Sequence, residues 1–302
     1  MFAKSALLAL MLQQIVIPFG RPPPYERARA PIAEAGPAWA ATCTDDDGWE
    51  KPAPPVRIHG NTYLVGTCGI SAILIVGDKG DILIDSGTQA GAELVAANIR
   101  ALGFALANVR ILLTSHEHFD HVGGMARLQR LTGATLVTSA PAARVVSSGI
   151  PATDDPQAGL VKPFPGASVG RVIADGETVR LGNLQLTAIA TPGHTSGAIS
   201  WRWESCDGGV CRTIVYADSL SPVSNKSYRF ADHPAALAAF RASIAKIGSS
   251  RCEILLTPHP SAGGMRARLA AGQTLLDTNG CRAFAAARTK ALDDRLAQER
   301  AR

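Results

Sequence analysis

The stretch HEHFDH, at residues 116–121, places three imidazoles and one carboxylate within six residues. It follows an apolar run that predicts a buried strand, so a rigid sheet would hold these side chains. Imidazole nitrogens and carboxylate oxygens are common protein ligands of Zn²⁺. In such a turn His116 and His118 can reach one metal ion, while Asp120 and His121 reach a second. A solvated polar loop rarely has this density of histidines.

Two further histidines repeat the pattern of a strand followed by a histidine. His194 lies in the sequence TPGHT and His259 in TPHP, each directly after an apolar run. A lone histidine in that position is usually structural, but beside a metal-binding turn the two would complete the ligand sets. We therefore expect His116, His118 and His194 on a first zinc ion, and Asp120, His121 and His259 on a second. Three protein ligands on each ion leave room for water, which is the pattern of a catalytic site.

Apolar runs and turn residues divide most of the chain into strands and helices. Strands are predicted at 62–65, 70–76, 81–85, 109–114, 135–139, 184–190, 199–203, 213–216 and 254–257. Helices are predicted at 90–102, 123–131 and 234–247 and beyond residue 266, while 149–170 is expected to be a loop. This order predicts an α/β fold of two mixed sheets packed together, with helices on the outer faces. A doubly wound sheet is the alternative, but no glycine-rich nucleotide turn follows the first strand.

The N-terminal region has a different character. Lys4 precedes an apolar run over 5–17, which a proline-rich segment ends. The run is shorter than the roughly 20 residues of a membrane-spanning helix, so it predicts a signal peptide. An N-terminal anchor or a buried helix is the alternative. We expect residues 1–30 to be the signal peptide and a basic, proline-rich segment, with no defined cleavage site. Residues 31–59 would form an N-terminal arm and 60–302 the catalytic domain of a periplasmic or secreted protein without a stable membrane anchor.

The positive charge does not indicate nucleic-acid binding. The formal net charge is +5, but residues 1–30 hold four basic residues and one acidic residue, which leaves +2 for the remainder. The other basic residues are scattered without a stripe or interleaved aromatic residues. We therefore expect a small-molecule substrate and no nucleic-acid partner.

Six cysteines all lie beyond the predicted signal peptide. An even number in an exported chain predicts disulfides, and the absence of a Cys-x-x-Cys pair disfavours a zinc site. Cys206 and Cys211 flank an Asp-Gly-Gly turn and would bridge a hairpin. Proximity in sequence pairs Cys43 with Cys68 and Cys252 with Cys281, although other connectivities stay open.

At these motifs the sequence resembles the metallo-β-lactamase superfamily, over nearly the whole span from residue 60 to about 259. The residues that carry the resemblance are IDSG at 84–87, TSHEHFDHVGG at 114–124, TPGHT at 191–195, YADS at 216–219 and TPHP at 257–260. Within that superfamily the chain is most similar to the subclass B3 metallo-β-lactamases, through NTYLVGT at 61–67, LVTSA at 136–140 and DSLS at 218–221. The resemblance implies an αβ/βα sandwich.

The resemblance also implies a function and roles for individual residues. It implies two zinc ions, and hydrolysis of the amide bond of β-lactam antibiotics by a metal-bound hydroxide that Asp120 orients, with antibiotic resistance as the result. Ser219 and Ser221 would lie near the substrate carboxylate, and Asp85 would support a ligand or buried backbone from behind. A disulfide near the C-terminus of this subclass supports the pairing of Cys252 with Cys281.

Two other functions stay open on this fold. A glyoxalase-II-like thioesterase or a lactonase shares the HxHxDH segment and both later histidines, and adds an aspartate that bridges the metals. Asp218 lies at about that place in the sequence, so its contacts distinguish the two hypotheses. A zinc-binding protein without catalysis is the second alternative, and a complete ligand set disfavours it. We expect a monomer, because no interface signal is evident.

Overall fold

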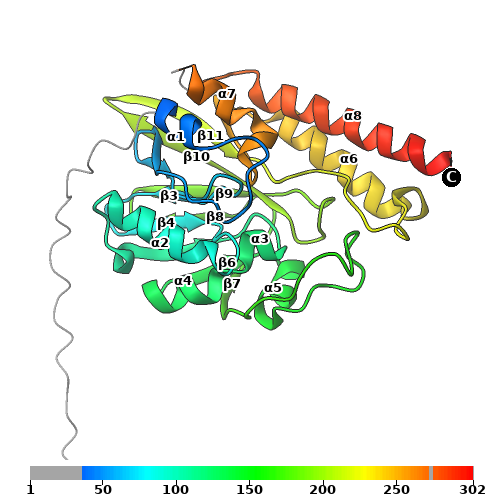
Figure 1. The fold of residues 1–302 in the computed structure, drawn as a ribbon, viewed down its shortest axis with the longest axis horizontal. Coiled ribbons are helices and arrows are strands. Elements are labelled where there is room, and N and C mark those ends of the chain that lie inside the picture. Colours follow the sequence, from blue (N-terminus) through cyan, green and yellow to red (C-terminus); the bar gives the residue numbers. More distant parts are fainter. Residues whose placement is uncertain (1–35, 272–274, 302) are drawn as a thin grey trace, which may run out of the picture.

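Two β-sheets stacked face to face form the centre of the protein (Figure 1). The computed structural model describes residues 36–271 and 275–301, so the predicted signal peptide lies outside the described residues. The first sheet contains, in spatial order, β1 (Val56–His59), β2 (Thr62–Leu64), β3 (Ile73–Ile75), β4 (Asp81–Ile84), β5 (Val109–Leu113), β6 (Thr135–Thr138) and β7 (Val169–Val172). The second contains β12 (Ile254–Leu256), β11 (Val210–Tyr216), β10 (Ile199–Asp207), β9 (Leu184–Ala190) and β8 (Thr178–Leu181).

Both sheets are mixed. The strands of the first sheet are antiparallel from β1 to β4 and parallel from β4 to β7. In the second sheet β11 and β12 are parallel, and the other neighbours are antiparallel. This topology confirms the predicted α/β fold with two mixed sheets.

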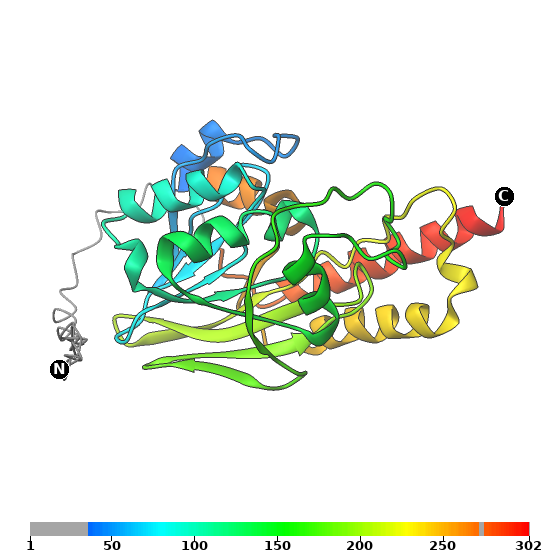
Figure 2. The ribbon, with the colours of Figure 1, turned by 90° about the horizontal axis from the view of Figure 1, so that it is seen from below.

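Helices cover the outer face of the first sheet and part of the outer face of the second (Figure 2). The helices over the first sheet are α2 (Gly91–Ala101), α4 (Met125–Thr132) and α5 (Ala140–Ser148). The helices over the second sheet are α6 (Pro234–Ser249) and α8 (Gly280–Arg300). The short helices α1 (Gly36–Thr42) and α7 (Met265–Ala270) pack against each other, and α3 (Phe119–Val122) lies in the loop after β5. Among the described residues, no helix is long and apolar enough to cross a membrane.

The alternation of side chains along the strands explains the layers. Ile73 and Ile75 of β3 point into the core between the sheets, whereas Leu74 packs under the helices of the first sheet. Tyr216 of β11 faces the central core and Val215 faces α6 and α8. Because successive strand residues point to opposite faces, an apolar run without polar interruption buries both faces of its strand. Apolar runs in the sequence therefore indicate a sheet covered on both sides.

Strands at the edges of the sheets were harder to predict. The structure adds β1 within the expected N-terminal arm, β7 across the end of the expected loop, and β8 in an unassigned segment. Their sequences mix polar and apolar residues, and β7 is largely exposed. Edge strands bury only part of their surface, so they lack the long apolar run of a central strand.

Local signals set the bounds of α5, which leads into the loop beside the site. The Ser139 hydroxyl accepts a hydrogen bond from the Ala142 amide at 3.3 Å, so it caps the first turn. Gly149 ends the helix with φ of 70°, and its amide donates to the Val145 carbonyl. The Ser139 hydroxyl also donates to the Gly197 carbonyl at 2.7 Å, which ties α5 to the loop that carries His194.

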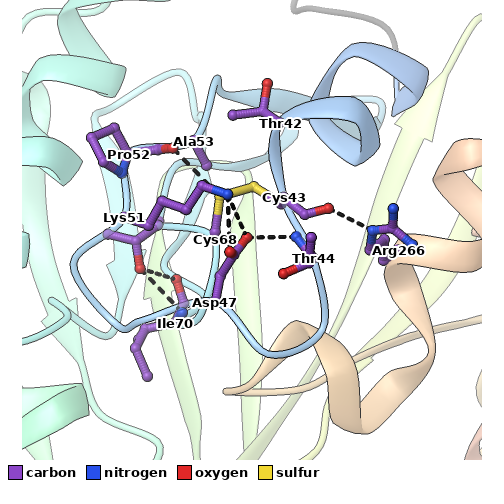
Figure 3. The surroundings of a disulfide bond; sticks show 12 residues. Thr42, Cys43, Thr44, Asp47, Lys51, Pro52, Ala53, Cys68, Ile70 and Arg266 are labelled. Atoms are coloured by element: carbon purple, nitrogen blue, oxygen red, sulfur yellow. Dashed lines mark hydrogen bonds and ion pairs between the residues drawn. A yellow bond between two sulfur atoms is a disulfide. The ribbon is translucent and has the colours of Figure 1, made fainter.

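All six cysteines form disulfides, in the three pairs that the sequence predicts. Cys43–Cys68 joins the segment after α1 to the loop after β2 (Figure 3), where the Arg266 guanidinium also donates to the Cys43 carbonyl. The other two pairs are Cys206–Cys211, across the β10–β11 hairpin, and Cys252–Cys281, between the segment that precedes β12 and the first turn of α8. The sulfur atoms near Asp47 are bonded to each other, so that cluster is not a metal site.

Candidate metal centre

The expected metal ligands lie at one end of the two sheets, on loops that directly follow strands. His116, His118, Asp120 and His121 follow β5 of the first sheet. His194 follows β9 and His259 follows β12, both of the second sheet. The two sheets thus bring together side chains that are far apart in the sequence.

His116, His118 and His194 form the first cluster. Each contributes one ligand nitrogen to a group in which the ligand atoms lie within 4.8 Å of one another. Their ring centroids are 4.8 to 4.9 Å apart, and all three side chains are buried. This triangle fits three ligands of one metal ion.

The second ring nitrogen of each of these histidines has a partner outside the cluster. The partner atoms are Asp218 Oδ1, 2.8 Å from His116 Nδ1; Asp155 Oδ2, 3.0 Å from His118 Nε2; and the Ser221 carbonyl oxygen, 2.9 Å from His194 Nδ1. When the outer nitrogen donates to such an acceptor, the inner nitrogen keeps its lone pair for a metal. Histidine ligands of metals are almost always oriented in this way.

Asp120 and His121 form a second cluster beside the first. Their ligand atoms group with a nitrogen of His116 within 4.8 Å. His259 completes it from the other sheet, with Nε2 at 3.5 Å from Asp120 Oδ2 and 3.3 Å from His121 Nε2. The outer nitrogen of His259, Nδ1, lies 3.2 Å from the Gly69 carbonyl oxygen. The six expected ligands therefore form two adjoining groups, and His116 lies between them.

Asp85 supports the site from behind, at the end of β4. Its carboxylate accepts hydrogen bonds from the Ser115 amide, the Ser115 hydroxyl and the Tyr216 hydroxyl, each at 2.7 Å. Its Oδ2 also lies 3.6 Å from His121 Nδ1. Asp85 has a positive φ of 62°, which aspartate tolerates better than most residues. The carboxylate thus fixes the start of the metal-binding turn and contacts a candidate ligand.

Electrostatics favour neutral imidazoles at three of the candidate ligands. Burial, with His121 and His118 nearby, holds the pKa of His116 well below its usual value. Burial and the neighbouring histidines lower the pKa of His194 to about 3 and that of His259 to about 4. A neutral imidazole is the form that binds a metal.

The pKa shifts of His121 and Asp120 show that this part of the site favours positive charge. Burial opposes protonation of His121, but Asp120 and Asp85 outweigh it and raise its pKa to about 10. Burial likewise opposes ionisation of Asp120, yet His121 beside it holds the carboxyl pKa below its usual value. The recorded ion-pair partners of Asp85, Asp120 and Asp218 are all histidines. A cation among these buried carboxylates would therefore be favoured.

A buried nitrogen without a hydrogen-bond partner lies in the same group of candidate ligands. His116 Nε2 is buried without a hydrogen-bond partner, although buried polar nitrogens are nearly always paired. This nitrogen belongs to the ring whose Nδ1 contacts Asp218. An unpaired lone pair among nitrogens and a carboxylate oxygen is the arrangement that a metal ion satisfies, so the residues present fit a metal centre.

Ser219 and Ser221 lie in the loop after β11, on either side of Leu220. The Ser219 hydroxyl is buried and has no hydrogen-bond partner. The Ser221 hydroxyl lies 3.0 Å from His194 Nδ1, beside the carbonyl that contacts the same nitrogen. Leu220 has φ of 45°, an unusual conformation that recurs at functional sites. Ser219 therefore has a free hydroxyl, whereas Ser221 contacts a candidate ligand.

Two residues of the site were missed in the sequence. Asp155 contacts His118 from the loop after α5. Glu117 points away from the ligands on either side of it and accepts hydrogen bonds from the Thr195 hydroxyl at 2.7 Å and the Gly197 amide at 3.0 Å. Burial raises the pKa of Glu117. A carboxylate that alternates with ligand histidines is a signal that could have identified Glu117, whereas no local pattern marks Asp155.

A cavity of about 390 Å³ borders the site. Its walls include Trp49, Phe119 and Lys162, and the Lys162 ammonium lies 5.5 Å from the centroid of the Phe119 ring. The Trp49 ring lies 5.4 Å from Phe119 and 6.1 Å from His259, between centroids. The walls also include Lys51 and Glu50, so this cavity beside the candidate metal centre combines aromatic and charged side chains.

The sequence model of the metallo-beta-lactamase superfamily matches this chain over residues 65–259, which include every candidate ligand. This chain belongs to that superfamily. Solved structures of its members support the assignment in detail. The MIM-2 metallo-beta-lactamase has 54% sequence identity and a TM-score of 0.85, over 89% of this chain and all of that one. MIM-1 from Novosphingobium pentaromativorans has 47% identity and a TM-score of 0.85, over 87% of this chain and 98% of that one. SMB-1, solved with bound 2-mercaptoethanesulfonate, has 45% identity and a TM-score of 0.81, over 84% of this chain and all of that one.

Relatives in the family include other hydrolases. The chain is 25% identical to a hydroxyacylglutathione hydrolase of Rhodospirillum rubrum over 126 residues, which are 42% of this chain and 40% of the relative. It is 31% identical to a probable metallo-hydrolase of Burkholderia pseudomallei over 146 residues, 45% of this chain and 48% of the relative. The chain thus spans less than half the length of these relatives, but nearly the whole length of the solved lactamases.

Proposed function

We propose that this protein is a zinc-dependent β-lactamase that hydrolyses the amide bond of β-lactam antibiotics and confers resistance to them. The observation that carries the proposal is the pair of adjoining ligand groups on the scaffold of a metallo-beta-lactamase. Metallo-beta-lactamases that match nearly end to end at 45 to 54% identity support the substrate class.

The donor set supports two zinc ions. His116, His118 and His194 would hold the first ion, and Asp120, His121 and His259 the second. Histidine nitrogens with one carboxylate and no thiolate suit Zn²⁺, and three protein ligands leave a position for water. When bound, such ions supply a Lewis acid and lower the pKa of water towards neutrality.

The side chains around the ions would direct the reaction. Asp120, held between His121 and His259, would orient the attacking water towards the lactam carbonyl. As the new C–O bond forms and the C–N bond breaks, one proton of that water would pass to the ring nitrogen. The free Ser219 hydroxyl would donate a hydrogen bond to the substrate carboxylate, with Ser221 beside it. Asp85 would keep the turn and His121 in place.

The contacts of Asp218 favour the lactamase over a thioesterase or lactonase. The alternative requires an aspartate that bridges the two ions. Asp218 instead lies 2.8 Å from the outer nitrogen of His116. This carboxylate would support a ligand and not be one, which leaves Ser219 free for the substrate. Hydroxyacylglutathione hydrolases match over a smaller share of the chain than the solved lactamases do.

We also propose that the protein acts outside the cytoplasm, periplasmic or secreted, after loss of a signal peptide. Three disulfides that include all six cysteines suit an oxidising compartment. A single chain supplies both ligand sets, so a monomer would be sufficient for catalysis.

The experiment that tests the function is hydrolysis of a carbapenem and a cephalosporin by the purified protein with Zn²⁺, with and without a chelator, beside a lactone and a thioester. We expect rapid, chelator-sensitive loss of both lactams. H118A and D120A should abolish turnover, whereas H59A should not, because His59 lies on β1, outside both ligand groups. Turnover of only the lactone or the thioester would overturn the proposed substrate class, but the assignment of the metal ligands would stand.

A further inference from the structure

Asp155 is a buried carboxylate in a loop that connects two secondary-structure elements, α5 and β7. Only 8% of the surface of Asp155 is exposed to solvent, whereas the adjacent Asp154 lies on the surface. Oδ2 lies 3.0 Å from His118 Nε2, and Oδ1 accepts a hydrogen bond from the Gln157 amide at 2.6 Å. Both oxygens therefore accept hydrogen bonds, one from a candidate metal ligand and one from the backbone of its own loop.

We propose that Asp155 is a positioning residue for His118, and that Asn225, in the segment between β11 and α6, holds the loop of Asp155 in place. The inference rests on the metal centre of the proposed function. With Nε2 of His118 donating to Asp155, the other ring nitrogen, Nδ1, keeps its lone pair. His118 would bind the metal through Nδ1, whereas His116 and His194 would do so through Nε2, because their Nδ1 atoms face outward.

Asn225 connects the two loops that flank the site. The backbone amide of Asn225 donates to the Pro156 carbonyl at 2.8 Å, and the side-chain Nδ2 donates to the Ala158 carbonyl at 2.9 Å. Its Oδ1 accepts from the amides of Ser227 and Tyr228, at 2.9 and 2.8 Å. Two of these hydrogen bonds join Asn225 to the segment after Asp155, and the other two lie within residues 225–228.

This second loop is in turn attached to the end of α8. Glu299 accepts hydrogen bonds from the amides of Phe230 and Ala231, and Arg295 donates to the Ser224 hydroxyl at 2.6 Å. These polar contacts link α8 to Asn225, and Asn225 in turn binds the backbone on either side of Gln157, whose amide donates to Asp155. Such contacts give an otherwise irregular loop a fixed conformation, which an oriented ligand requires.

The chemistry of Asp155 makes a specific substitution informative. Asparagine has nearly the same shape, but one of its two terminal atoms is an NH₂ donor. Because the partners on both sides are donors, an amide at this position must face one of them with a donor. Either His118 loses its acceptor or the Gln157 amide does. Asp154→Asn is the matched control, since it makes the same chemical change at the adjacent, exposed residue.

The experiment measures Zn²⁺ affinity of the full-length protein by competition with a chromophoric chelator, and the visible spectrum of the Co²⁺-substituted protein. We expect D155N to weaken binding of one metal ion about 10- to 100-fold and to change the ligand-field bands, with the other ion unaffected. D154N should match the unchanged protein in both measurements. If D155N and D154N were indistinguishable, the proposal would be wrong.

A second variant keeps the test decisive should D155N not fold. N225A leaves Asp155 and His118 intact but releases their loop, so we expect a smaller loss of the same metal affinity at an unchanged melting temperature of the core. An N225A protein with unchanged metal affinity would overturn the role of this loop contact. Neither measurement uses a lactam, so a protein that bound metal as expected but hydrolysed no lactam would refute the proposed function alone.

Discussion

Oδ1 of Asp218 lies 2.8 Å from Nδ1 of His116, and both side chains are completely buried. A carboxylate at the outer nitrogen fixes the ring orientation and directs the proton to Nδ1. The inner nitrogen, Nε2, is the one left without a partner. This single contact therefore explains both the direction of the ligand and the role of the aspartate behind it.

From this contact we predict that D218N binds two metal ions with lower affinity. Loss of an oriented ligand costs roughly 10- to 100-fold in metal affinity, but no ligand is removed. Metal content by atomic emission, together with chelator competition, measures both quantities. A D218N protein that retained only one ion under saturating Zn²⁺ would indicate that Asp218 bridges the metals, and would favour the thioesterase alternative.

Removal of the metal should destabilise the fold as well as abolish activity. A ligand that binds only the native state stabilises it by about 4 kcal/mol at 1,000 times its dissociation constant. We expect the melting temperature to fall by several degrees after chelation and to recover when Zn²⁺ is restored. H118A should show a smaller shift on chelation, because it has lost a ligand. Equal melting temperatures with and without metal would contradict this prediction.

Glu299 should make stability depend on pH. Burial opposes its ionisation, but the Ala231 and Phe230 amides and Arg295 outweigh it and lower its pKa below the usual 4.5. A depressed pKa means that the stabilisation is fully present above pH 4.5 and is lost as the pH falls through the lower, folded-state value. We predict that E299Q costs about 2 kcal/mol in the free energy of unfolding at pH 7, and less in acid.

The control for this measurement is D294N on the same helix. Asp294 pairs with Lys290 at 2.6 Å, but their side chains are 55% and 77% exposed. Exposed pairs contribute about 0 to 1 kcal/mol, so D294N should have little effect at any pH. Urea unfolding between pH 3.5 and 7 compares the two variants. A constant difference between E299Q and the unchanged protein across this range would refute the linkage.

The disulfides should differ in their contribution to stability. Cys252 and Cys281 are 29 residues apart, whereas Cys206 and Cys211 are 5 apart. Loop-closure entropy then predicts a loss of about 3.5 kcal/mol when the first pair is replaced by alanine, and about 2 kcal/mol for the second. Guanidinium unfolding of the two double variants measures this order, and the reverse order would show that strain or packing dominates.

The central strands and the ligand residues could be predicted because their signals are local. Apolar runs such as 73–75 are buried on both faces of their strand, and the turn at 116–121 concentrates ligand types that few other structures need. The loop segments that carry His194 and His259 also directly follow predicted strands. Each of these features can be recognised within a window of about ten residues.

Asp155 and Glu117 escaped prediction because their roles depend on distant partners. Asp155 meets His118 across 37 residues of sequence, and Glu117 meets Thr195 across 78. A loop such as 149–170 adopts its conformation through contacts with Asn225, which nothing in its own sequence specifies. The edge strand β7 likewise depends on a distant partner, because its pairing with β6 and not its own composition makes it a strand.

The arrangement of the ligands also bears on how the chain matures. Each proposed set takes residues from the loop after β5 and one histidine from the other sheet, after β9 or after β12. Neither half of the chain alone therefore holds a complete set. We therefore expect metal binding to follow the packing of the two sheets during folding. Each bound ion would then link the two halves of the chain through its ligands.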